Sequence, residues 1–336
     1  MNHQVRTANA ALIAGILAAA QVPAYLPGQT LEHGAITTAN ADLFTESHFS
    51  EPMTNYAVGW TDPNGYDASS EFLAPALLPS GEKYEHIVYD NTEAFLSEGS
   101  FDDLRPIGTD FKNVQYTETK TTRTIPNRGL RIVLDWDRIK NTPNWQQLYT
   151  NRLLARLSRN AFRRKYALAL ANSTGASVTW STGASDADYD LANQVAISGD
   201  SSGITPNKAL FGLGAKLARY QGYGTQFTAA ALGGRVLSPE EAGQKIGIDV
   251  MVDQSRYQSG ASKTRIVGTK VLLFNASGVS GEDPSNFKTA RGVTQQGGRY
   301  AVYVRQLTVK QWEIVVETYE TEFCATTLGA RVLNVA

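Results

Sequence analysis

The chain has 336 residues, 42% of them hydrophobic and 19% charged, with a formal net charge of -1 at pH 7. This is ordinary globular composition, and the length leaves room for two domains or one large one. The balanced charge argues against a dedicated nucleic-acid-binding protein, because such proteins carry a clear basic excess.

Cysteine and histidine are too few and too scattered to indicate a disulfide framework or a metal site. The single cysteine, Cys324, lies in an apolar run typical of a strand, so we expect it to be buried as a small hydrophobic residue. No two of the four histidines have metal-ligand spacing: His3, His33, His48 and His86. The sequence therefore predicts no metal and no other cofactor.

The first 60 residues are low in charge and predict an N-terminal arm. Residues 1–24 contain an alanine-rich apolar centre after Arg6, which resembles a short signal peptide but is too short to span a bilayer. We expect a short amphipathic helix here, with an exported leader as the alternative. Residues 25–60 fit neither helical nor strand periodicity, which predicts an extended segment that takes its order from its neighbours.

The next two segments carry opposite charge. From Tyr66 to Glu118 there are eleven acidic residues against three basic ones, whereas from Thr119 to Lys165 there are twelve basic residues against two acidic ones. Turn signals in the acidic segment predict a protruding loop or hairpin, and an irregular stretch of this length points to contacts outside the subunit. Opposite signs favour pairing between subunits or, just as readily, within one chain.

Residues 141–172 predict one long helix. Asn141 and Thr142 are cap-type residues, and Pro143 suits the first turn. At about 1.5 Å per residue the helix would reach about 45 Å, so it must cross between modules or between subunits. Helical spacing places an apolar set and a cationic set on opposite sides: Leu154, Leu157, Ala161 and Leu168 against Arg152, Arg156, Arg159 and Arg163.

Three aspartates follow the long helix at alternate positions, Asp186, Asp188 and Asp190. An EF-hand loop would need glycine and an acid where this chain has Leu191 and Ile197, so we expect the aspartates to cap the next helix.

The rest of the chain alternates strands and helices. Residues 204–223 predict a short strand and a helix without the spacing of a phosphate loop, and Ser238 starts another helix. Ile248 to Val252 and Lys263 to Phe274 predict two strands separated by a mobile turn. Residues 300–336 are the most β-rich part and predict two or more long antiparallel strands.

This order of elements resembles the major capsid protein of tailed bacteriophages, which has the Hong Kong 97-type fold. Four stretches carry the resemblance: TWSTGASDADYDLANQV after the long helix, ITPNKALFGLGAKLARY, IGIDVMVDQSRY and GTKVLLFN. The resemblance implies an α+β capsid fold with a long spine helix. It also implies five segments: an arm at 1–54, an extended loop at 55–126, a peripheral domain at 127–202, an axial domain at 203–295 and C-terminal strands at 296–336 that return to the peripheral domain.

The resemblance further implies a non-enzymatic protein that assembles with itself into hexamers and pentamers of an icosahedral head around double-stranded DNA. The head would form in the host cytoplasm, with scaffold, portal and decoration proteins as further partners, non-specific contact with packaged DNA, and no membrane. Some relatives join subunits through Lys–Asn isopeptide bonds. Lys83 and Lys112 lie in the expected loop, but no acceptor asparagine or catalytic acid is apparent, so no crosslinking residue is carried over.

We expect contacts between subunits to involve residues of both charged segments: Arg152, Arg156, Arg159, Arg163, Glu82, Glu85, Asp90 and Glu93. Our first hypothesis is that the acidic loop of one subunit pairs with the basic segment of the next. Individual surface pairs contribute about 0–1 kcal/mol, so this pairing would affect register and assembly rate more than strength. The second hypothesis is that the arginines face the lumen and contact DNA, with a salt-sensitive affinity.

Three alternatives remain open. A nanocompartment shell of the same fold would enclose a cargo enzyme in place of a genome. A secreted β-rich binding protein would account for the apolar N-terminus and for the loops rich in threonine and glycine. An enzyme is the weakest alternative, because no nucleophile elbow, metal set or dinucleotide fingerprint is apparent.

Overall fold

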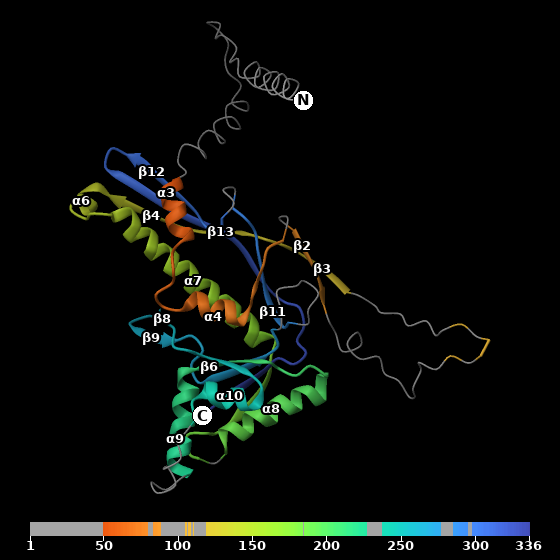
Figure 1. The fold of residues 1–336 in the computed structure, drawn as a ribbon. Helices are drawn as coiled ribbons and strands as arrows, with labels where there is room; N and C mark the ends of the chain where they lie inside the picture. The colour runs from red at the N-terminus through yellow and green to blue at the C-terminus, as the bar shows by residue number, and fades with distance from the viewer. Residues whose placement is uncertain are drawn as a thin grey trace, which may run out of the picture. The chain divides into compact units, whose positions relative to one another are not determined.

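The structure is a computed structural model that describes residues 50–79, 83–88, 105, 107–108, 110, 119–183, 185–226, 237–276, 285–294 and 298–336. The chain divides into two compact units, Met1–His48 and Phe49–Ala336, and every described residue belongs to the second. Figure 1 labels the elements of this unit. The helix expected within residues 1–24 lies outside the described residues.

The long helix is present as α7, Trp145–Ala171, and it begins later than the sequence predicts. Its N-cap is Asn144, whose φ of 56° is left-handed, a conformation that asparagine tolerates better than most residues. A separate short helix, α6 (Trp136–Ile139), precedes it, and the N–H of Thr142 bonds to the carbonyl of Ile139 at 2.8 Å. Residues 141–143 therefore connect two helices and do not form the first turn of α7.

Two helices precede the first sheet where the sequence predicted irregular chain: α3 (Glu51–Val58) and α4 (Tyr66–Leu73). Each has eight residues, which is too short for an isolated helix to be stable, and both pack against α7. Met53 and Ala57 of α3 are buried at an i, i+4 spacing. The prediction of an extended segment as far as residue 60 is wrong for α3, because this short apolar stripe is supported by tertiary packing.

The first sheet is built around the C-terminal strand β13. Its strand order is β1-β11-β13-β12, and β4 also pairs with β13. Residues 311–317 of β13 pair with β12 on one side, residues 311–319 pair with β4 on the other, and residues 320–324 pair with β11. These antiparallel pairs confirm the predicted C-terminal strands. The strands span Ala76–Leu77 (β1), Asn127–Asp135 (β4), Phe287–Arg291 (β11), Ala301–Thr308 (β12) and Gln311–Cys324 (β13).

The second sheet has the order β5-β14-β10-β6-β7 and is accompanied by three helices. The strands span Thr174–Val178 (β5), Lys208–Gly212 (β6), Asp249–Asp253 (β7), Lys270–Phe274 (β10) and Arg331–Val335 (β14), and the helices span Ala187–Ser202 (α8), Leu213–Gln226 (α9) and Pro239–Ile246 (α10). This sheet includes β5 and β14 from outside residues 203–295, whereas β11 from inside that range belongs to the first sheet. Assignment of the two sheets to peripheral and axial domains stays a prediction.

The run predicted as one strand from Lys263 to Phe274 is two strands. β8 (Arg256–Ser259) and β9 (Ser262–Arg265) form a hairpin, and the chain then turns at Gly268, whose φ is +69°, before β10. Glycine suits this position because it adopts a positive φ without steric cost.

Two helix starts agree with the sequence. The side chain of Asp186 caps α8 by accepting the N–H of Asp188 at 2.9 Å, as expected for these aspartates. Ser238 and Glu241 form a capping box at α10, in which each side chain accepts the other's backbone N–H.

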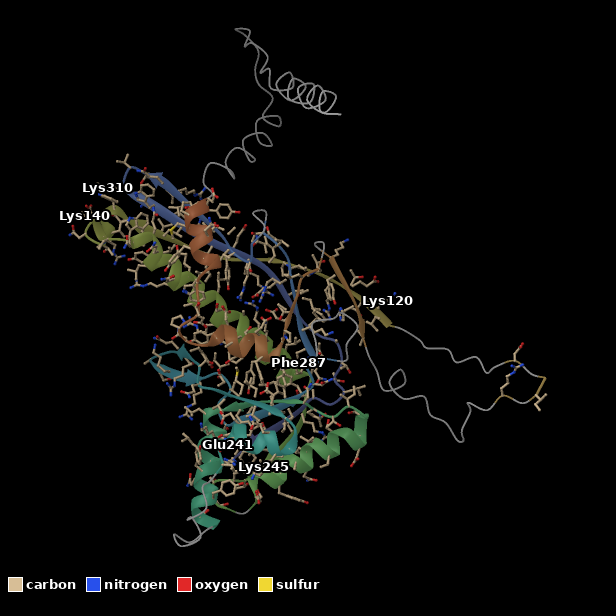
Figure 2. The ribbon with its side chains drawn as sticks, in the orientation of Figure 1. Lys120, Lys140, Glu241, Lys245, Phe287 and Lys310 are labelled. Atoms are coloured by element: carbon tan, nitrogen blue, oxygen red, sulfur yellow. The ribbon has the colours of Figure 1, made fainter. Side chains whose placement is uncertain are left out.

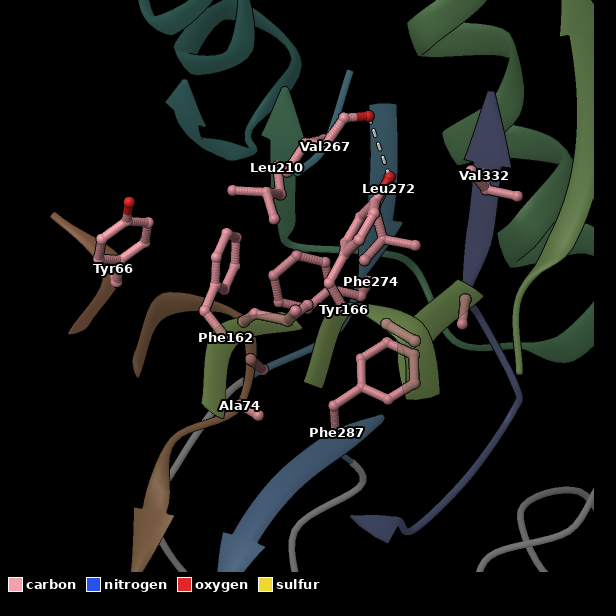
Figure 3. Packing of buried hydrophobic residues seen from close by; sticks show 14 residues of the cluster. Tyr66, Ala74, Phe162, Tyr166, Leu210, Val267, Leu272, Phe274, Phe287 and Val332 are labelled. Carbon is pink, nitrogen blue, oxygen red and sulfur yellow. Dashed lines mark hydrogen bonds between the residues drawn. The ribbon is translucent and has the colours of Figure 1, made fainter. Parts of the chain in front are cut away.

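The two ends of α7 enter two different hydrophobic clusters. Near its N-terminus Leu153, Leu154 and Leu157 pack with Ile314 and Val316 of the first sheet. Near its C-terminus Phe162, Tyr166 and Ala169 pack with one face of the second sheet, as Figure 3 shows around Leu210, Leu272 and Phe274. The Tyr166 hydroxyl also donates to the Val267 carbonyl at 3.2 Å. α7 thus contributes side chains to both hydrophobic cores.

The other face of the second sheet is covered by helices. Phe211, Val271 and Leu273 pack there against Leu191 of α8 and Ala215 of α9. Neighbouring residues along β6 and β10 therefore belong to different clusters, as the two-residue period of a strand requires. Burial on both faces explains why these strands are continuously apolar.

Two glycines of α9 offer a matched stability test. A Cβ atom on Gly222 would lie 2.2 Å from the carbonyl oxygen of the buried Trp180, whereas a Cβ on Gly224 meets nothing within 4 Å. We expect Gly222→Ala to lower the free energy of unfolding by about 1–3 kcal/mol through overpacking. Gly224→Ala should raise it by up to about 1 kcal/mol through helix propensity. Urea unfolding followed by circular dichroism measures both, and equal effects would contradict the packing described here.

Candidate functional site

The four arginines singled out from the sequence form one face of α7, and we refer to them as the arginine row. Arg152, Arg156 and Arg163 are exposed, and Arg159 is half-buried. On the other side of the helix Leu154, Leu157 and Ala161 are buried, as the spacing predicts, whereas Leu168 is only half-buried.

The guanidinium groups of Arg152, Arg159 and Arg163 lie beside aromatic side chains. Arg163 lies 4.0 Å from the ring centroid of Tyr257, and Arg152 lies 5.1 Å from that of Tyr149. Arg159 lies beside the Tyr66 hydroxyl; burial raises the pKa of Tyr66, and the positive charge of Arg159 partly offsets the rise. Among the described residues no carboxylate forms an ion pair with any member of the row.

Other basic residues of the same segment pair with glutamates of β13. Arg164 bonds to Glu320 and to Glu322, each at 2.6 Å, and Arg128 bonds to Glu322 at 3.3 Å. The carboxylates of Glu320 and Glu322 are nearly buried. Because a buried carboxylate without a partner is strongly destabilising, Arg128 and Arg164 are needed for the stability of the fold.

Glu313 is the most deeply buried acid of β13. It is 0% exposed and accepts from Arg131 of β4 at 3.3 Å and from Arg305 of β12. It lies on the sheet face that points away from α7, since its neighbour Ile314 packs toward the helix. Three adjacent strands are therefore joined by charge as well as by backbone hydrogen bonds.

The described acids of the acidic segment also pair with the C-terminal part of the chain. Asp67 bonds to Arg299 at 3.0 Å and Glu71 to Arg291 at 3.4 Å. These ion pairs join both segments to C-terminal strands and connections of the same chain. Glu85 is exposed on β2, whereas three other predicted contact residues lie outside the described residues: Glu82, Asp90 and Glu93.

The base of the predicted loop is a two-stranded hairpin, formed by β2 (Lys83–Val88) and β3 (Thr119–Thr124), which confirms the hairpin prediction. His86 anchors it: the side chain is 3% exposed and its ring centroid lies 4.3 Å from that of Phe323 in β13. Neither ring nitrogen has a hydrogen-bond partner among the described residues. Burial lowers the pKa of His86, and the charges of Arg123 and Lys288 lower it further.

Lys165 is a buried basic residue whose burial the sequence pattern did not predict. It is 1% exposed, and its Nζ lies 3.4 Å from the carbonyl oxygen of Ser70 and 3.3 Å from that of Ala74, at the C-terminus of α4. The negative end of a helix dipole attracts a cation at this position. Burial nevertheless lowers the pKa of Lys165 to about 8, and the nearby carboxylates of Glu320 and Glu71 counteract this.

The lone cysteine lies beside a cavity at the foot of the hairpin. The cavity has a volume of about 460 Å³ and is lined by Val88, Arg123, Glu322 and Cys324, among others. The Cys324 thiol is half-buried and donates to the Thr326 carbonyl at 3.1 Å. Burial raises its pKa to about 11, so the thiol is protonated and unreactive near neutral pH.

No group of three or more His, Cys, Asp or Glu side chains in the described part of the chain could hold a metal ion. No helix in these residues is both long and apolar enough to cross a membrane.

Solved structures with low sequence identity share this architecture. A phage-related protein from Bordetella bronchiseptica RB50 matches with a TM-score of 0.61 and 16% identity, over 85% of this chain and 97% of that one. The capsid structure of the cyanophage P-SCSP1u matches with a TM-score of 0.51 and 13% identity, over 79% of this chain and 87% of that one. An encapsulin complex from Synechococcus elongatus PCC 7942 has a TM-score of 0.47 and 13% identity, over 82% and 90%. No family model and no curated protein matches the sequence.

The matches to the phage-related protein and to the cyanophage capsid show the fold. The chain has the α+β fold of the tailed-phage major capsid proteins, the Hong Kong 97-type fold that the sequence resemblance implied.

Substitution of His86 tests the anchor of the hairpin. Because the folded-state pKa of His86 lies below its ordinary value, the unfolded or undocked state binds the proton more readily. The docked hairpin is therefore fully stable above about pH 6.5, and it loses stability as the pH falls below that value. We expect hydrogen exchange of the amides in residues 83–88 and 119–124 to speed up between pH 7.5 and 5.5, after correction for intrinsic exchange.

His86→Phe keeps a ring at the same place but cannot bind a proton. We expect this variant to lose most of the pH dependence in the hairpin while the exchange of α7 amides stays as in the original protein. An equal pH response in both proteins would exclude His86 as its source.

Proposed function

We propose that this protein is the major capsid protein of a tailed phage, and that its copies assemble into hexamers and pentamers of an icosahedral head around double-stranded DNA. The observation that carries the proposal is the extent of the structural likeness. The match to the phage-related protein spans 85% of this chain and 97% of the other, so the shared fold is not that of a fragment. The match to the cyanophage capsid supplies the link to a shell.

Exposed apolar side chains at one end of the first sheet support a role in assembly. Val309 is 89% exposed and Leu307 is 41% exposed, both at the turn between β12 and β13. Trp136 is 42% exposed and lies beside them, because its backbone N–H donates to the Lys310 carbonyl at 2.6 Å. Single exposed apolar residues are ordinary, but three together at one tip favour a contact with another protein surface. In a shell that surface would be a second copy of the chain.

The remaining assignments follow from the capsid role. The protein would reside in the virion head after assembly in the host cytoplasm, with scaffold, portal and decoration proteins as partners. It would perform no catalysis. Its function would lie in complementary surfaces distributed over several interfaces, which closed symmetry repeats around the shell.

Negative-stain microscopy of the purified protein, with size-exclusion chromatography, tests the proposal. We expect hollow closed shells, or rings of five and six subunits. A strict monomer at high concentration across a range of salt would contradict the proposal. Particles that contain a protein cargo and no nucleic acid would assign the protein to the nanocompartments, whereas particles that contain nucleic acid support the phage assignment.

A further inference from the structure

The arginine row is a cationic surface without acidic residues of its own. α7 contains no aspartate or glutamate in its 27 residues. Arg152 and Arg163 are eleven positions apart, which corresponds to about 16 Å along the helix axis. The row therefore presents one positive charge for about every 5 Å over three turns.

The β8–β9 hairpin beside the row contributes no negative charge. Arg163 lies on the ring of Tyr257, so the β8–β9 hairpin borders this part of α7. The pairing register places Arg256, Lys263 and Arg265 on the face of the hairpin opposite Tyr257. No acidic residue occurs from position 254 to position 270. The hairpin therefore places no carboxylate next to the row.

The nearest acids are already occupied. Asp62 accepts the backbone N–H groups of Asn64 and Asp67 at 3.0 and 3.1 Å. Asp253 is buried, and its carboxylate accepts the hydroxyls of Ser69 and Ser255 at 3.0 and 2.8 Å. Neither carboxylate forms an ion pair with the arginine row within the described structure, which leaves the row available to an external anion.

Comparison with Arg164 shows what the row lacks. Arg164 is on the same helix, and its guanidinium is taken up by two glutamates of β13. The guanidinium groups of Arg152 and Arg163 are instead held over aromatic rings. A stacked guanidinium is restrained while its N–H groups remain able to bind a phosphate or a carboxylate.

Two anionic partners could bind the row, the acidic segment of a neighbouring copy and duplex DNA, and they differ in the density of their negative charge. The acidic segment of a neighbouring copy carries nine acids in residues 82–118, or about one in four, and a fully extended chain would space them about 13 Å apart. Duplex DNA carries one charge per about 1.7 Å of axis. Of these two partners, duplex DNA offers the denser row of anions and matches the spacing of about 5 Å more closely.

We propose that the arginine row binds the phosphate backbone of duplex DNA without reading its sequence. This inference deepens the proposed capsid function, in which DNA is enclosed, and assigns the contact to one helix face. It differs from the first sequence hypothesis, in which the same arginines pair with the acidic loop of the next subunit.

Fluorescence anisotropy with labelled 20-base-pair duplexes, on unassembled subunits and at several salt concentrations, tests the proposal. The test variant is Arg152→Gln/Arg156→Gln/Arg163→Gln, which retains the half-buried Arg159. The control is Arg138→Gln/Lys140→Gln/Lys310→Gln, which removes the same charge from exposed residues near the tip of the first sheet, where Figure 2 labels Lys140 and Lys310. Among the described residues, Lys140 and Lys310 form ion pairs with the exposed Asp137 alone, at 3.1 and 3.3 Å.

We expect the slope of log K against log salt to fall in magnitude by about three in the row variant, because each lost phosphate contact removes about 0.9. The slope of the control should change by less than about one. Two duplexes of unrelated sequence should bind the original protein with equal affinity. Unchanged thermal melting of both variants would show that the fold is retained.

Equal salt slopes for the original protein and the row variant would overturn the proposal. So would a synthetic peptide of residues 82–118 that binds the row while the duplex does not, since this would assign the row to a neighbouring subunit. The outcome is separate from that of the shell test. Shells without row-dependent DNA binding contradict this inference alone, and row-dependent binding by a protein that never forms shells contradicts only the capsid proposal.

Discussion

The fold depends on the packing of one helix into two cores. α7 carries Leu154 into the cluster of the first sheet and Phe162, eight positions later, into that of the second. A straight helix places these side chains about 12 Å apart along one rigid axis. The separation of the two sheets is therefore set by α7, and neither hydrophobic cluster can form in full without it. The short helices α3 and α4, which have too few residues to be stable alone, gain their order from the same surface.

A second constraint comes from the carboxylates of β13. Glu313, Glu320 and Glu322 are buried or nearly so, and each is bonded to arginine from another element. Buried ion pairs contribute little net stability compared with apolar packing, but loss of one partner is costly. Their effect here is to specify which strands lie beside β13 and how α7 crosses it. They also give partners to Arg128, Arg131 and Arg164, for which the sequence left pairing within the chain and pairing between subunits equally open.

The sequence predicted those features that depend on local pattern. The long helix, the caps at Asp186 and Ser238, the hairpin and the terminal antiparallel strands all follow from spacing or from side-chain chemistry within a few residues. The predicted start of α7 is too early. Pro143 suggested a first helical turn, but Asn144 is the N-cap and takes a left-handed conformation that the sequence pattern does not indicate. α3 was missed because only two of its eight residues are buried and hydrophobic, which makes a weak pattern.

The candidate site could be predicted only in part. Helical period was enough to group the arginine row, since it needs no tertiary information. Which arginines meet a carboxylate could not be predicted, because the partners of Arg128, Arg131 and Arg164 lie more than 150 residues away in sequence. Glu313 and Glu317 share one face of β13 while Ile314 and Val316 share the other, and this alternation was the available signal that the strand carries acids in need of partners. Nothing comparable marked His86 or Lys165, whose burial arises from elements distant in the chain.

The solitary thiol at the foot of the hairpin gives the molecule a built-in reporter. Cys324 lines the same cavity as Val88 and Arg123 of the hairpin, and burial keeps the thiol protonated. Displacement of the hairpin would open the cavity to solvent and return the thiol toward its ordinary acidity. The rate of its alkylation would then report, without any engineered label, how often the hairpin leaves its place in a free subunit and whether neighbouring copies hold it down.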